Sequence, residues 1–361
     1  MLAETEVVPY LLRRKLLPAR AVVEGDLSVI DASRRNHNFG VIRSRGASYF
    51  LKQGTDPEHN ASIANEANVY QRFYSDQKNI AFTRYLPRYF GHDPDDHILF
   101  IEFLTGVEDL QQYHSRCGRF PTRIAASIGD ALRLLHRESS IIGKGNEPLL
   151  ECPAPWVFSI HHPDIEILLS MSEASIQVIK IIQLYPEFSG LLDELHRGWK
   201  SETVIHSDFK WNNCLVSRSM RNTTIHIVDW ELAGLGDPAW DLGSVISAYL
   251  SFWLLFVPLA TDAQPAESLQ LARYPLEKFH PAFRAFWQSY LRGTKISQAG
   301  AEHMLCRAVK YGAARLAQSA YEQMQVSPQL VGNAVCSLQL SLNILKRPED
   351  AIRDLLGSPL V

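Results

Sequence analysis

The stretch that most constrains the fold is HSDFKWNNCLV, residues 206–216, where polar residues run directly into strand-forming ones. TVI precedes this stretch and TIHIVDW follows it at residues 224–230. Short strands on both sides of a polar loop would fix its side chains in space, as a catalytic loop requires. The alternative is a solvated hairpin, because Asp and Asn are common turn residues.

The size and composition of the chain predict a globular protein with two lobes. It has 361 residues, and a chain of this length usually needs more than a single hydrophobic core. Of these residues, 46% are hydrophobic. A net charge of −3 argues against a general nucleic-acid binder. The five cysteines are widely spaced, with no cysteine pair or histidine cluster at zinc-ligand spacing. Together with an N-terminus that reverses the charge order of a secretory signal, they predict a cytoplasmic protein.

Residues 242–261, LGSVISAYLSFWLLFVPLAT, form an uncharged run of membrane-spanning length. Ser244, Ser247, Ser251 and Pro258 interrupt its apolar character, and no basic flank orients it. We therefore predict a helix buried in a large lobe and no membrane segment.

The hydrophobic pattern predicts strands in the first hundred residues and helices afterwards. Hairpin strands ending at YFLKQ, a helix over residues 60–74 and two further strands in RYLPRYFGHD and HILFIEFL form the first part. Helices are expected over residues 121–139, 164–183, 278–292, 299–324 and 329–345. The predicted fold is α+β and bilobal, with a small β-rich lobe over residues 1–103 that binds nucleotide. Residues 104–361 form a large, mostly helical lobe that carries the catalytic and substrate sites.

Three oxygen-bearing side chains follow short strands in the second lobe. Asp208 and Asn213 share the polar loop, and Asp229 ends the next strand, where a hairpin return would bring it beside that loop. Carboxylate and amide oxygens suit Mg²⁺ and are poor zinc ligands, so Asn213 and Asp229 are candidate metal ligands. Asp208 is then free to orient a hydroxyl group, and Lys210 would keep it ionised and touch a transferring phosphoryl group.

Lys52 lies inside the apolar strand YFLKQ, where an unpaired lysine is costly. On its own it would fit the solvent face of an edge strand. Glu66 on the following helix is a natural partner that would hold Lys52 toward the phosphates of a nucleotide. Asp237 and Asp241 in DPAWDLGSV are expected to be structural, Asp237 as a helix N-cap and Asp241 as a brace for the loop at His206.

Together, HSDFKWNN, IVDWE, GDPAWDLGS, FLKQ with Glu66, and LFIEFLTG resemble the aminoglycoside phosphotransferase and choline kinase superfamily, relatives of protein kinases. The resemblance implies a protein-kinase-like fold and ATP with Mg²⁺. It implies Asp208 as the catalytic base, Asn213 and Asp229 as metal ligands, and Lys52 with its partner Glu66 on the phosphates. It also implies that the backbone from Glu102 to Leu104 binds adenine. Asn38, in the nucleotide-covering turn RRNHNFG, is counted with the cofactor-binding residues.

Three features depart from that pattern. Ser207 follows the histidine where the family usually has glycine, although a small residue still fits. RRNHNFG replaces a run of glycines, and Arg34 and Arg35 would supply charge there instead. Lys210 matches Ser/Thr protein kinases, but residues 232–236 are too short for an activation segment that docks a protein substrate.

The strings RRNHNF, FLKQ and HSDFKWNN are most similar to phosphotransferase-like proteins found with ribosomally made peptide natural products of the lanthipeptide and thioamitide type. The expected acceptor is therefore a Ser or Thr hydroxyl of a precursor peptide, activated for elimination by a partner lyase. One alternative is a kinase of an aminoglycoside, amino sugar or choline-like alcohol, which calls for an acidic pocket; the scattered candidate acids are Glu151, Asp164, Glu166 and Glu322. Another is an inactive kinase fold that serves as a binding module.

Overall fold

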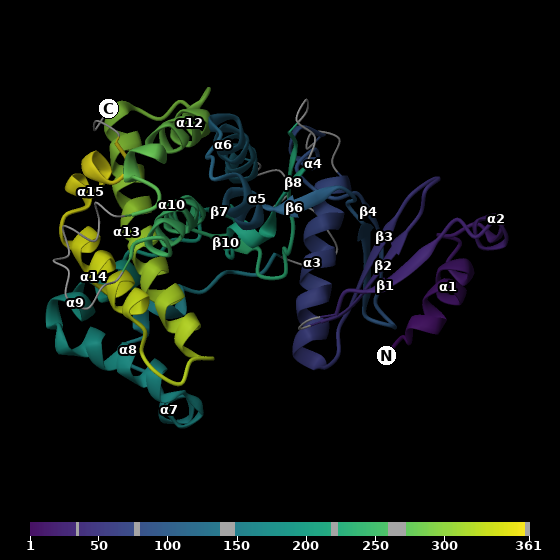
Figure 1. Ribbon diagram of the computed structural model, residues 1–361, viewed down its shortest axis with the longest axis horizontal. Coiled ribbons are helices and arrows are strands. Elements are labelled where there is room, and N and C mark those ends of the chain that lie inside the picture. Colours follow the sequence, from purple (N-terminus) through teal and green to yellow (C-terminus); the bar gives the residue numbers. More distant parts are fainter. Residues whose placement is uncertain (34–35, 76–79, 138–148, 218–222, 259–271, 358–361) are drawn as a thin grey trace. The chain divides into compact units, whose positions relative to one another are not determined.

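The computed structural model describes residues 1–33, 36–75, 80–137, 149–217, 223–258 and 272–357 (Figure 1). Its contacts divide the chain into two compact units. The first unit comprises residues 1–109, 138–150 and 213–233, and the second comprises residues 110–137, 151–212 and 234–361. The chain thus passes from the second unit back into the first between Asn212 and Asn213. The predicted functional division at residues 103 and 104 stays a prediction.

The first unit is built on a sheet of five antiparallel strands in the order β1-β2-β3-β5-β4. The strands are β1 (Ser28–Asp31), β2 (His37–Ile42), β3 (Tyr49–Gln53), β4 (Tyr89–Asp93) and β5 (Ile98–Glu102). These confirm the predicted hairpin strands and the two strands after the first helix. Lys52 lies on β3, which pairs with a strand on each side, so the alternative of an edge strand is wrong.

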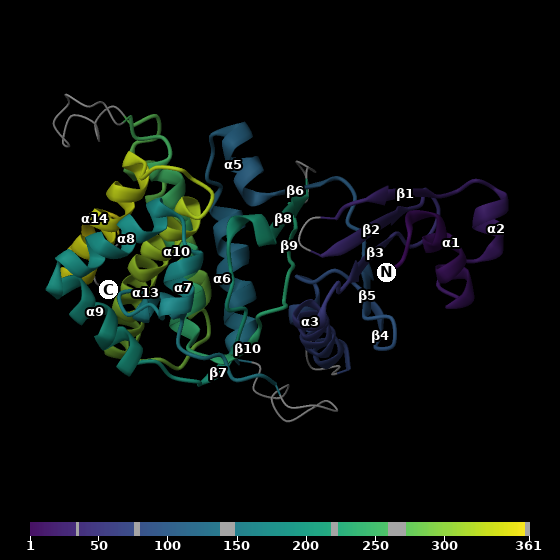
Figure 2. The same cartoon turned by 90° about the horizontal axis from the view of Figure 1, so that it is seen from below.

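The two faces of this sheet serve different purposes, because successive side chains of a strand point to opposite faces. Helix α1 (Glu4–Arg13) belongs to one hydrophobic cluster with Phe39, Leu51 and Phe100 of the sheet. Lys52, the next residue after Leu51, therefore faces the other side. Helix α3 (Pro57–Ser75) lies on that side, and Figures 1 and 2 show α1 and α3 on opposite faces of the sheet.

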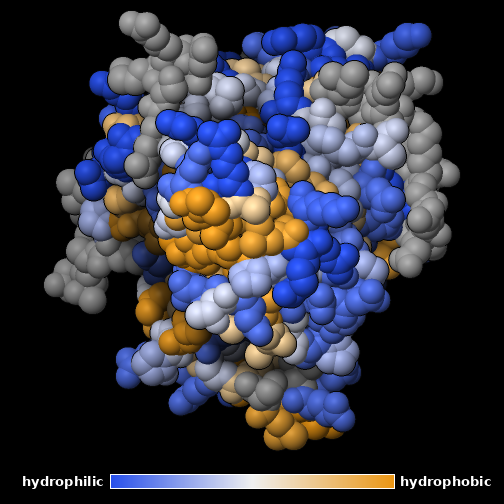
Figure 3. All heavy atoms as spheres, turned by 90° about the vertical axis from the view of Figure 1, so that its right-hand side faces the viewer, coloured by the Kyte–Doolittle hydropathy of each residue, from blue (hydrophilic) through white to orange (hydrophobic). Residues whose placement is uncertain are grey.

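Two short helices and a second, three-stranded sheet complete the first unit. The sheet has the order β6-β8-β9, and its strands are β6 (Val107–Asp109), β8 (Cys214–Ser217) and β9 (Ile225–Ile227). The helices are α2 (Ala19–Val23) and α4 (Ile80–Thr83). Val22 and Val23 of α2 are exposed. Figure 3 shows an apolar area of the surface that is framed by hydrophilic side chains.

The second unit is mostly helical, with one antiparallel pair of strands, β7 (Thr203–Ile205) and β10 (Gly234–Gly236). Its α-helices are α5 (Leu110–Cys117), α6 (Thr122–Arg137), α7 (Ile165–Ser170), α8 (Glu173–Leu184), α9 (Pro186–Arg197), α10 (Pro238–Leu254), α12 (His280–Leu291), α13 (Gln298–Met324), α14 (Gly332–Lys346) and α15 (Pro348–Asp354). Short 3₁₀ turns are η3 (Trp156–Ser159) and η5 (Leu276–Lys278), and a third, η4 (Trp211–Asn213), spans the boundary between the units.

The predicted helices are present, with one correction. The helix expected over residues 164–183 is two helices, α7 and α8. Ser172 separates them, because its side chain accepts a hydrogen bond from the Ser175 amide and caps the start of α8.

Helix α10 lies at the core of the second unit and packs closely on α13. A Cβ atom added to Gly243 would lie 2.6 Å from the Ala308 carbonyl oxygen and 2.6 Å from the Gly312 nitrogen. Only a residue without a side chain allows this approach of two backbones. The prediction of a buried helix is confirmed as far as Leu254, whereas residues 259–261 lie outside the described residues.

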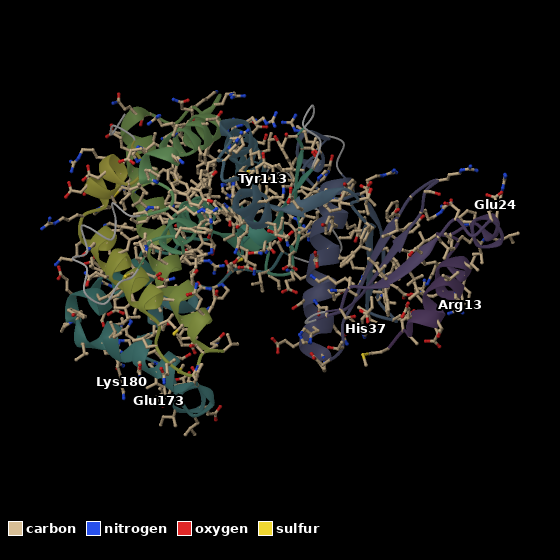
Figure 4. All side chains as sticks on the ribbon, viewed as in Figure 1. Arg13, Glu24, His37, Tyr113, Glu173 and Lys180 are labelled. Atoms are coloured by element: carbon tan, nitrogen blue, oxygen red, sulfur yellow. The ribbon has the colours of Figure 1, made fainter. Side chains whose placement is uncertain are left out.

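In the part of the chain that the structure describes, no helix has both the length and the apolar character needed to cross a membrane. Charged side chains such as Arg13, Glu24 and Lys180 are exposed on the outside of their helices (Figure 4). Opposite charges are thus distributed over the surface, as a net charge of −3 suggests.

Candidate functional site

The first group of chemical interest surrounds Lys52, which is buried in the first unit. Its Nζ atom lies 2.7 Å from Glu66 Oε2 and 2.7 Å from Asp229 Oδ1. Glu231 Oε2 is 3.6 Å away. The ion pair with Glu66 that the sequence predicts is therefore present, and two further carboxylates join it.

The charges of this group do not balance. Burial alone would lower the pKa of Lys52, but the nearby charges of Glu66, Asp229 and Glu231 outweigh it and raise the pKa well above its ordinary value. Lys52 thus stays protonated, and the three carboxylates, when ionised, exceed its single charge by two. Such an excess of hard oxygen donors in a buried place fits a divalent cation of the magnesium type.

A cavity of about 380 Å³ adjoins this group within the first unit. Its lining includes Lys52 and Glu66 together with Asn213 and Asp229, so the two candidate metal ligands open into one space. Glu102 and Leu104 also line it. The volume lies within the range of cavities that bind small molecules and cofactors.

Local pairing explains why Asn213 and Asp229 come together. Strands β8 and β9 pair antiparallel, and the Val228 amide donates to the Asn213 carbonyl oxygen at 3.0 Å. Asp229 then takes a left-handed backbone conformation with φ of 70°. The next amide, that of Trp230, donates to Glu66 Oε1 at 3.2 Å. A side chain at the end of a strand is thereby held beside the buried carboxylate of α3.

The remaining candidate nucleotide contacts lie around the same cavity. Asn38 pairs with Lys52 in the register of β2 and β3, lines the cavity, and has no partner for its Oδ1 atom among the described residues. The Phe103 amide donates to the Ser48 carbonyl oxygen at 3.0 Å, whereas no bond of the Leu104 amide is found in the described part of the chain. That leaves the Leu104 amide able to donate to a ligand. Arg34 and Arg35 lie outside the described residues.

The second group of chemical interest surrounds Asp208, in the second unit. Arg315 Nη2 of α13 lies 2.5 Å from Asp208 Oδ1, and Lys210 Nζ lies 2.7 Å from Oδ2. Burial by itself would raise the pKa of Asp208, but the charges of Arg315 and Lys210 outweigh it and hold the pKa below its ordinary value. Asp208 is therefore ionised near neutral pH and accepts hydrogen bonds on both oxygens.

The loop that carries Asp208 is braced from α10, as the sequence predicts. The buried Asp241 accepts the His206 amide at 2.8 Å and the Ser207 amide at 3.0 Å. Trp240 Nε1 donates to the Ser207 carbonyl oxygen at 2.7 Å. Ser207 has φ of 69°, a left-handed conformation that a glycine adopts with less strain. This conformation explains why the family usually has glycine here. Ser207 carries a small backbone strain, which the expectation that serine causes little loss leaves out.

Asp237 is confirmed as a helix N-cap. Its Oδ1 atom accepts the Ala239 amide at 3.0 Å, and Pro238 occupies the first turn of α10. Arg307 and Tyr311 of α13 also bond to its two oxygens. Asp237 is thereby committed to joining α10 and α13.

A second cavity, of about 360 Å³, adjoins Lys210 and Arg315 within the second unit. Serine residues of α10, Ser244, Ser247 and Ser251, line one side of it. Of the four scattered acids, Glu322 alone lines this cavity. The lining of this cavity is therefore not acidic enough to match the pocket that an aminoglycoside-like cationic acceptor calls for.

Sequence reasoning missed several of these residues. Arg315 looks like any basic residue of a long helix, and nothing local marks it as a partner of Asp208. Glu231 was visible in the string IVDWE but was given no separate role. The serines of α10 interrupt an apolar run in the sequence. Their spacing of three and four residues also puts them on one helix face.

One further polar group contains His161, His162 and Asp193, whose ligand atoms lie within 4.8 Å of one another. His161 Nε2 is 3.1 Å from Asp193 Oδ1, and His162 is exposed. The group lines neither cavity described above. The hydrogen bond between His161 and Asp193 accounts for its closeness.

Comparisons with known proteins bear on the family and the fold of the chain. A family model described as "Phosphotransferase enzyme family" matches residues 26–287. Among curated protein sequences, nothing matches this chain.

Solved structures of kinases are similar to the chain over almost its whole length. An ethanolamine kinase from Plasmodium vivax is 14% identical, with a TM-score of 0.58, 93% of this chain covered and 86% of that chain. A choline kinase from Cryptosporidium parvum is 14% identical, with a TM-score of 0.55 and 99% of each chain covered. A choline/ethanolamine kinase family protein from Mesorhizobium loti is 16% identical, with a TM-score of 0.53, 99% of this chain covered and 100% of that chain. At such identities the likeness shows the fold, and it confirms the predicted kinase-like α+β class.

Proposed function

The chain belongs to the phosphotransferase enzyme family, and from that membership and the two sites we propose that it transfers the γ-phosphate of ATP to an alcohol. The observation that carries the proposal is the buried cluster of Lys52 with Glu66 and Asp229 on a cavity that Asn213 shares. Lys52 binds the α and β phosphates, and Glu66 holds it in place. Asn213 and Asp229 hold a divalent cation, of which Mg²⁺ is the proposed one.

The adenine ring of ATP is assigned to the backbone between Glu102 and Leu104, where the Leu104 amide can donate. Asn38 beside Lys52 adds a polar contact to the nucleotide. A bound Mg²⁺ would offset negative charge on the phosphate oxygens. The solved structure of a similar protein, an amicoumacin kinase, is a complex with AMP-PNP and Ca²⁺, which supports a nucleotide and a metal here.

Asp208 acts on the acceptor. In the proposed step the alcohol oxygen forms a bond to the γ-phosphorus, and the bond from that phosphorus to the β,γ-bridging oxygen breaks. ADP leaves with the electron pair, and the hydroxyl proton passes to Asp208. Because the pKa of Asp208 is low, its main contribution is to orient the hydroxyl, while Lys210 offsets charge on the transferring group.

The proposed acceptor is a Ser or Thr hydroxyl of a ribosomally made precursor peptide of the lanthipeptide type. Phosphate is a good leaving group, so a partner lyase would then eliminate it to give a dehydroamino acid. The second cavity supports this acceptor over an aminoglycoside, because its described lining contains a single carboxylate, Glu322. The five cysteines are free, which suits the proposed cytoplasmic location.

The second candidate is a small amino alcohol. Similar structures include an ethanolamine kinase and an aminopropanol kinase, and this similarity supports such an acceptor. The third, an inactive fold that only binds, requires that exchange of Asp208 for Asn leave ATP turnover unchanged.

The experiment is incubation of the purified chain with Mg-ATP and candidate precursor peptides, followed by mass spectrometry. A gain of one phosphate on the peptide is expected, and the Asp208→Asn variant should give none. Phosphate transfer to amino alcohols or sugars, with none to any peptide, would refute the peptide acceptor.

A further inference from the structure

Three side chains in the second unit bring metal-ligating atoms close together, outside both cavities described above. His161 and His162 follow the 3₁₀ turn η3, and Asp193 lies on helix α9. One ligand atom from each, a ring nitrogen of either histidine and a carboxylate oxygen, lies within 4.8 Å of the other two. The three residues line neither the cavity beside Lys52 nor the one beside Lys210. The proposed phosphotransfer therefore leaves this group without a role.

The spacing of two of these atoms matches that of ligands on one metal ion. His161 Nε2 lies 3.1 Å from Asp193 Oδ1, and a hydrogen bond joins them. Two atoms that each lie 2.0–2.1 Å from a tetrahedral zinc ion are about 3.3 Å apart, so an ion can replace the bridging proton with little movement. The ring of His162 lies 4.1 Å from that of His161 between centroids, and His162 is exposed. Its side chain can thus turn to supply the third ligand.

The protonation state of His161 suits a metal ligand. Burial and the neighbouring His162 lower the pKa of His161, and together they outweigh the opposing effect of Asp193. The imidazole is therefore neutral near pH 7, as metal binding requires. A neutral ring carries one proton, and with that proton on Nδ1 the lone pair of Nε2 is available to an ion.

The backbone around the group is fixed on both sides. Gln183 Nε2 of α8 donates to the His161 carbonyl oxygen at 2.8 Å. The His162 amide donates to the Ser159 carbonyl oxygen at 2.9 Å. Asp193 lies well inside α9 (Pro186–Arg197). Ligands that rigid elements hold in place lose little freedom when an ion binds.

The ligand types select the kind of ion. Two imidazole nitrogens and one carboxylate oxygen suit zinc, whereas magnesium prefers oxygen ligands alone. Three protein ligands leave the fourth position of a tetrahedral zinc ion to water. Asp193 follows His161 by 32 positions, so no local motif in the sequence indicates such a site.

We propose that His161, His162 and Asp193 bind a zinc ion that joins the loop after η3 to helix α9. The ligands come from segments that only folding brings together, so zinc binds the folded chain and stabilises it by mass action. The site is separate from the proposed magnesium site and does not depend on the phosphotransfer.

The test is a titration of the purified, chelator-treated chain with Zn²⁺ by calorimetry, in an excess of Mg²⁺ that occupies oxygen-ligand sites. Titration with Co²⁺ gives a second readout, because four-coordinate Co²⁺ absorbs visible light. His162→Ala and Asp193→Asn each remove one ligand whose side chain is accessible, so neither variant disturbs the core. The matched control is His303→Ala, since His303 is an exposed histidine of α13 outside the group.

We expect the wild-type chain to bind one zinc ion and to show the visible absorption of bound Co²⁺. His162→Ala and Asp193→Asn should each raise the Kd for Zn²⁺ by at least about 10-fold, because even the loss of a group that only supports a ligand costs about 10- to 100-fold. Zn²⁺ should raise the thermal unfolding temperature of the wild type and of His303→Ala, and should raise it less in the two ligand variants. Without zinc, all four chains should turn over Mg-ATP at the same rate.

Two results overturn the proposal. One is a wild-type chain that binds neither Zn²⁺ nor Co²⁺ in excess Mg²⁺. The other is a Kd for Zn²⁺ that stays the same in both ligand variants, which would place the ion elsewhere on the chain. Neither result bears on the phosphotransfer, which is measured with Mg-ATP in the absence of zinc.

Discussion

The two carboxylates assigned to the chemistry have opposite surroundings. Asp229 meets one cation, Lys52, in the company of Glu66 and Glu231, so negative charge is in excess. Asp208 meets two cations, Arg315 and Lys210, so positive charge is in excess. The first arrangement suits a site that receives a metal ion, and the second suits a site where a negatively charged phosphoryl group meets an alcohol. The same residue type is thus proposed for two different roles because its neighbours differ.

The strongest way to separate these roles is to exchange each carboxylate for an amide. Asp208→Asn should lower kcat by about 10²–10⁴-fold, because the group that orients the hydroxyl is lost, with the KM for ATP little changed. Asp229→Asn should lower kcat to a similar degree and also weaken ATP binding and its dependence on Mg²⁺. Steady-state kinetics with ATP and Mg²⁺ titrations measure both.

The control for these exchanges is Asp164→Asn, since Asp164 is exposed and lines neither cavity. Equal effects of Asp208→Asn and Asp229→Asn on the KM for ATP would contradict the division of roles.

The excess negative charge around Asp229 makes Lys52 important for folding. Lys52→Met leaves Glu66, Asp229 and Glu231 without their cation, so it should lower the free energy of unfolding by about 3–5 kcal/mol. Because the pKa of Lys52 is raised in the folded state, this contribution is full below the ordinary lysine pKa, about 10.4, and is lost as the pH rises through the folded value. Chemical denaturation at pH 7 and at pH 10, both below that range, measures the contribution, which should be the same at both.

Lys200→Met is the matched control for Lys52→Met. Lys200 is 56% exposed and pairs with Glu202 at 3.3 Å, so its loss should cost at most about 1 kcal/mol. If the two variants were equally stable, the Lys52 cluster would not hold the first unit together as described.

The excess positive charge around Asp208 predicts an unequal effect of its two cations. The side chain of Arg315 is 9% exposed and that of Lys210 is 46% exposed, so water screens Lys210 more. Arg315→Met should lower kcat/KM for the acceptor by about 10-fold and move the acid limb of the pH profile upward, because burial then raises the pKa of Asp208. Lys210→Met should move that limb less.

In the wild type, the lowered pKa of Asp208 predicts that the acid limb lies below the ordinary aspartate value of about 3.9. The contribution of the ion pairs to stability is likewise present above that value and is lost as the pH falls through the folded pKa. If the acid limb of the pH profile moved further in Lys210→Met than in Arg315→Met, the expected order of the two cations would be wrong.

The smallest expected effect concerns the backbone beside Asp208. Ser207 and Asp229 both have positive φ angles, and Ser207 bonds to Asp241 and Trp240 through its backbone and to Cys152 through its side chain. Ser207→Gly should raise the free energy of unfolding by about 0.5–1 kcal/mol, because glycine avoids the Cβ strain of that conformation. Ser207→Ala keeps the Cβ atom and should give no gain. Thermal unfolding of both variants measures the difference, and equal stabilities would show that no strain is stored there.

The sequence predicted those features that follow from local pattern. The hairpin strands, the helices and the loop from His206 to Asn213 all have their signals within a few consecutive residues. The pairing of Lys52 with Glu66 was predictable because a buried lysine must have a partner and the next helix offers one. The roles of these residues in the reaction stay predictions.

What the sequence could not reveal depends on contacts between distant segments. Arg315 and Asp208 form an ion pair although they are 107 positions apart in the sequence. Nothing in the residues around an arginine on a helix indicates such a partner. The serines of α10 line a cavity because α13 packs beside them. Helix breaks are equally hidden, since Ser172 divides one periodic stretch into two helices through a single capping bond.

The contact of Gly243 with Gly312 has a consequence for how acceptor preference could change. On both α10 and α13 the cavity residues lie C-terminal to that contact, Ser244 to Leu255 on one helix and Arg315 to Gln323 on the other. The crossing point admits no larger side chain, whereas Ser247 and Ser251 line the cavity beyond it and are not part of the crossing. Evolution or engineering can thus reshape the pocket residue by residue while the crossing keeps both helices in register.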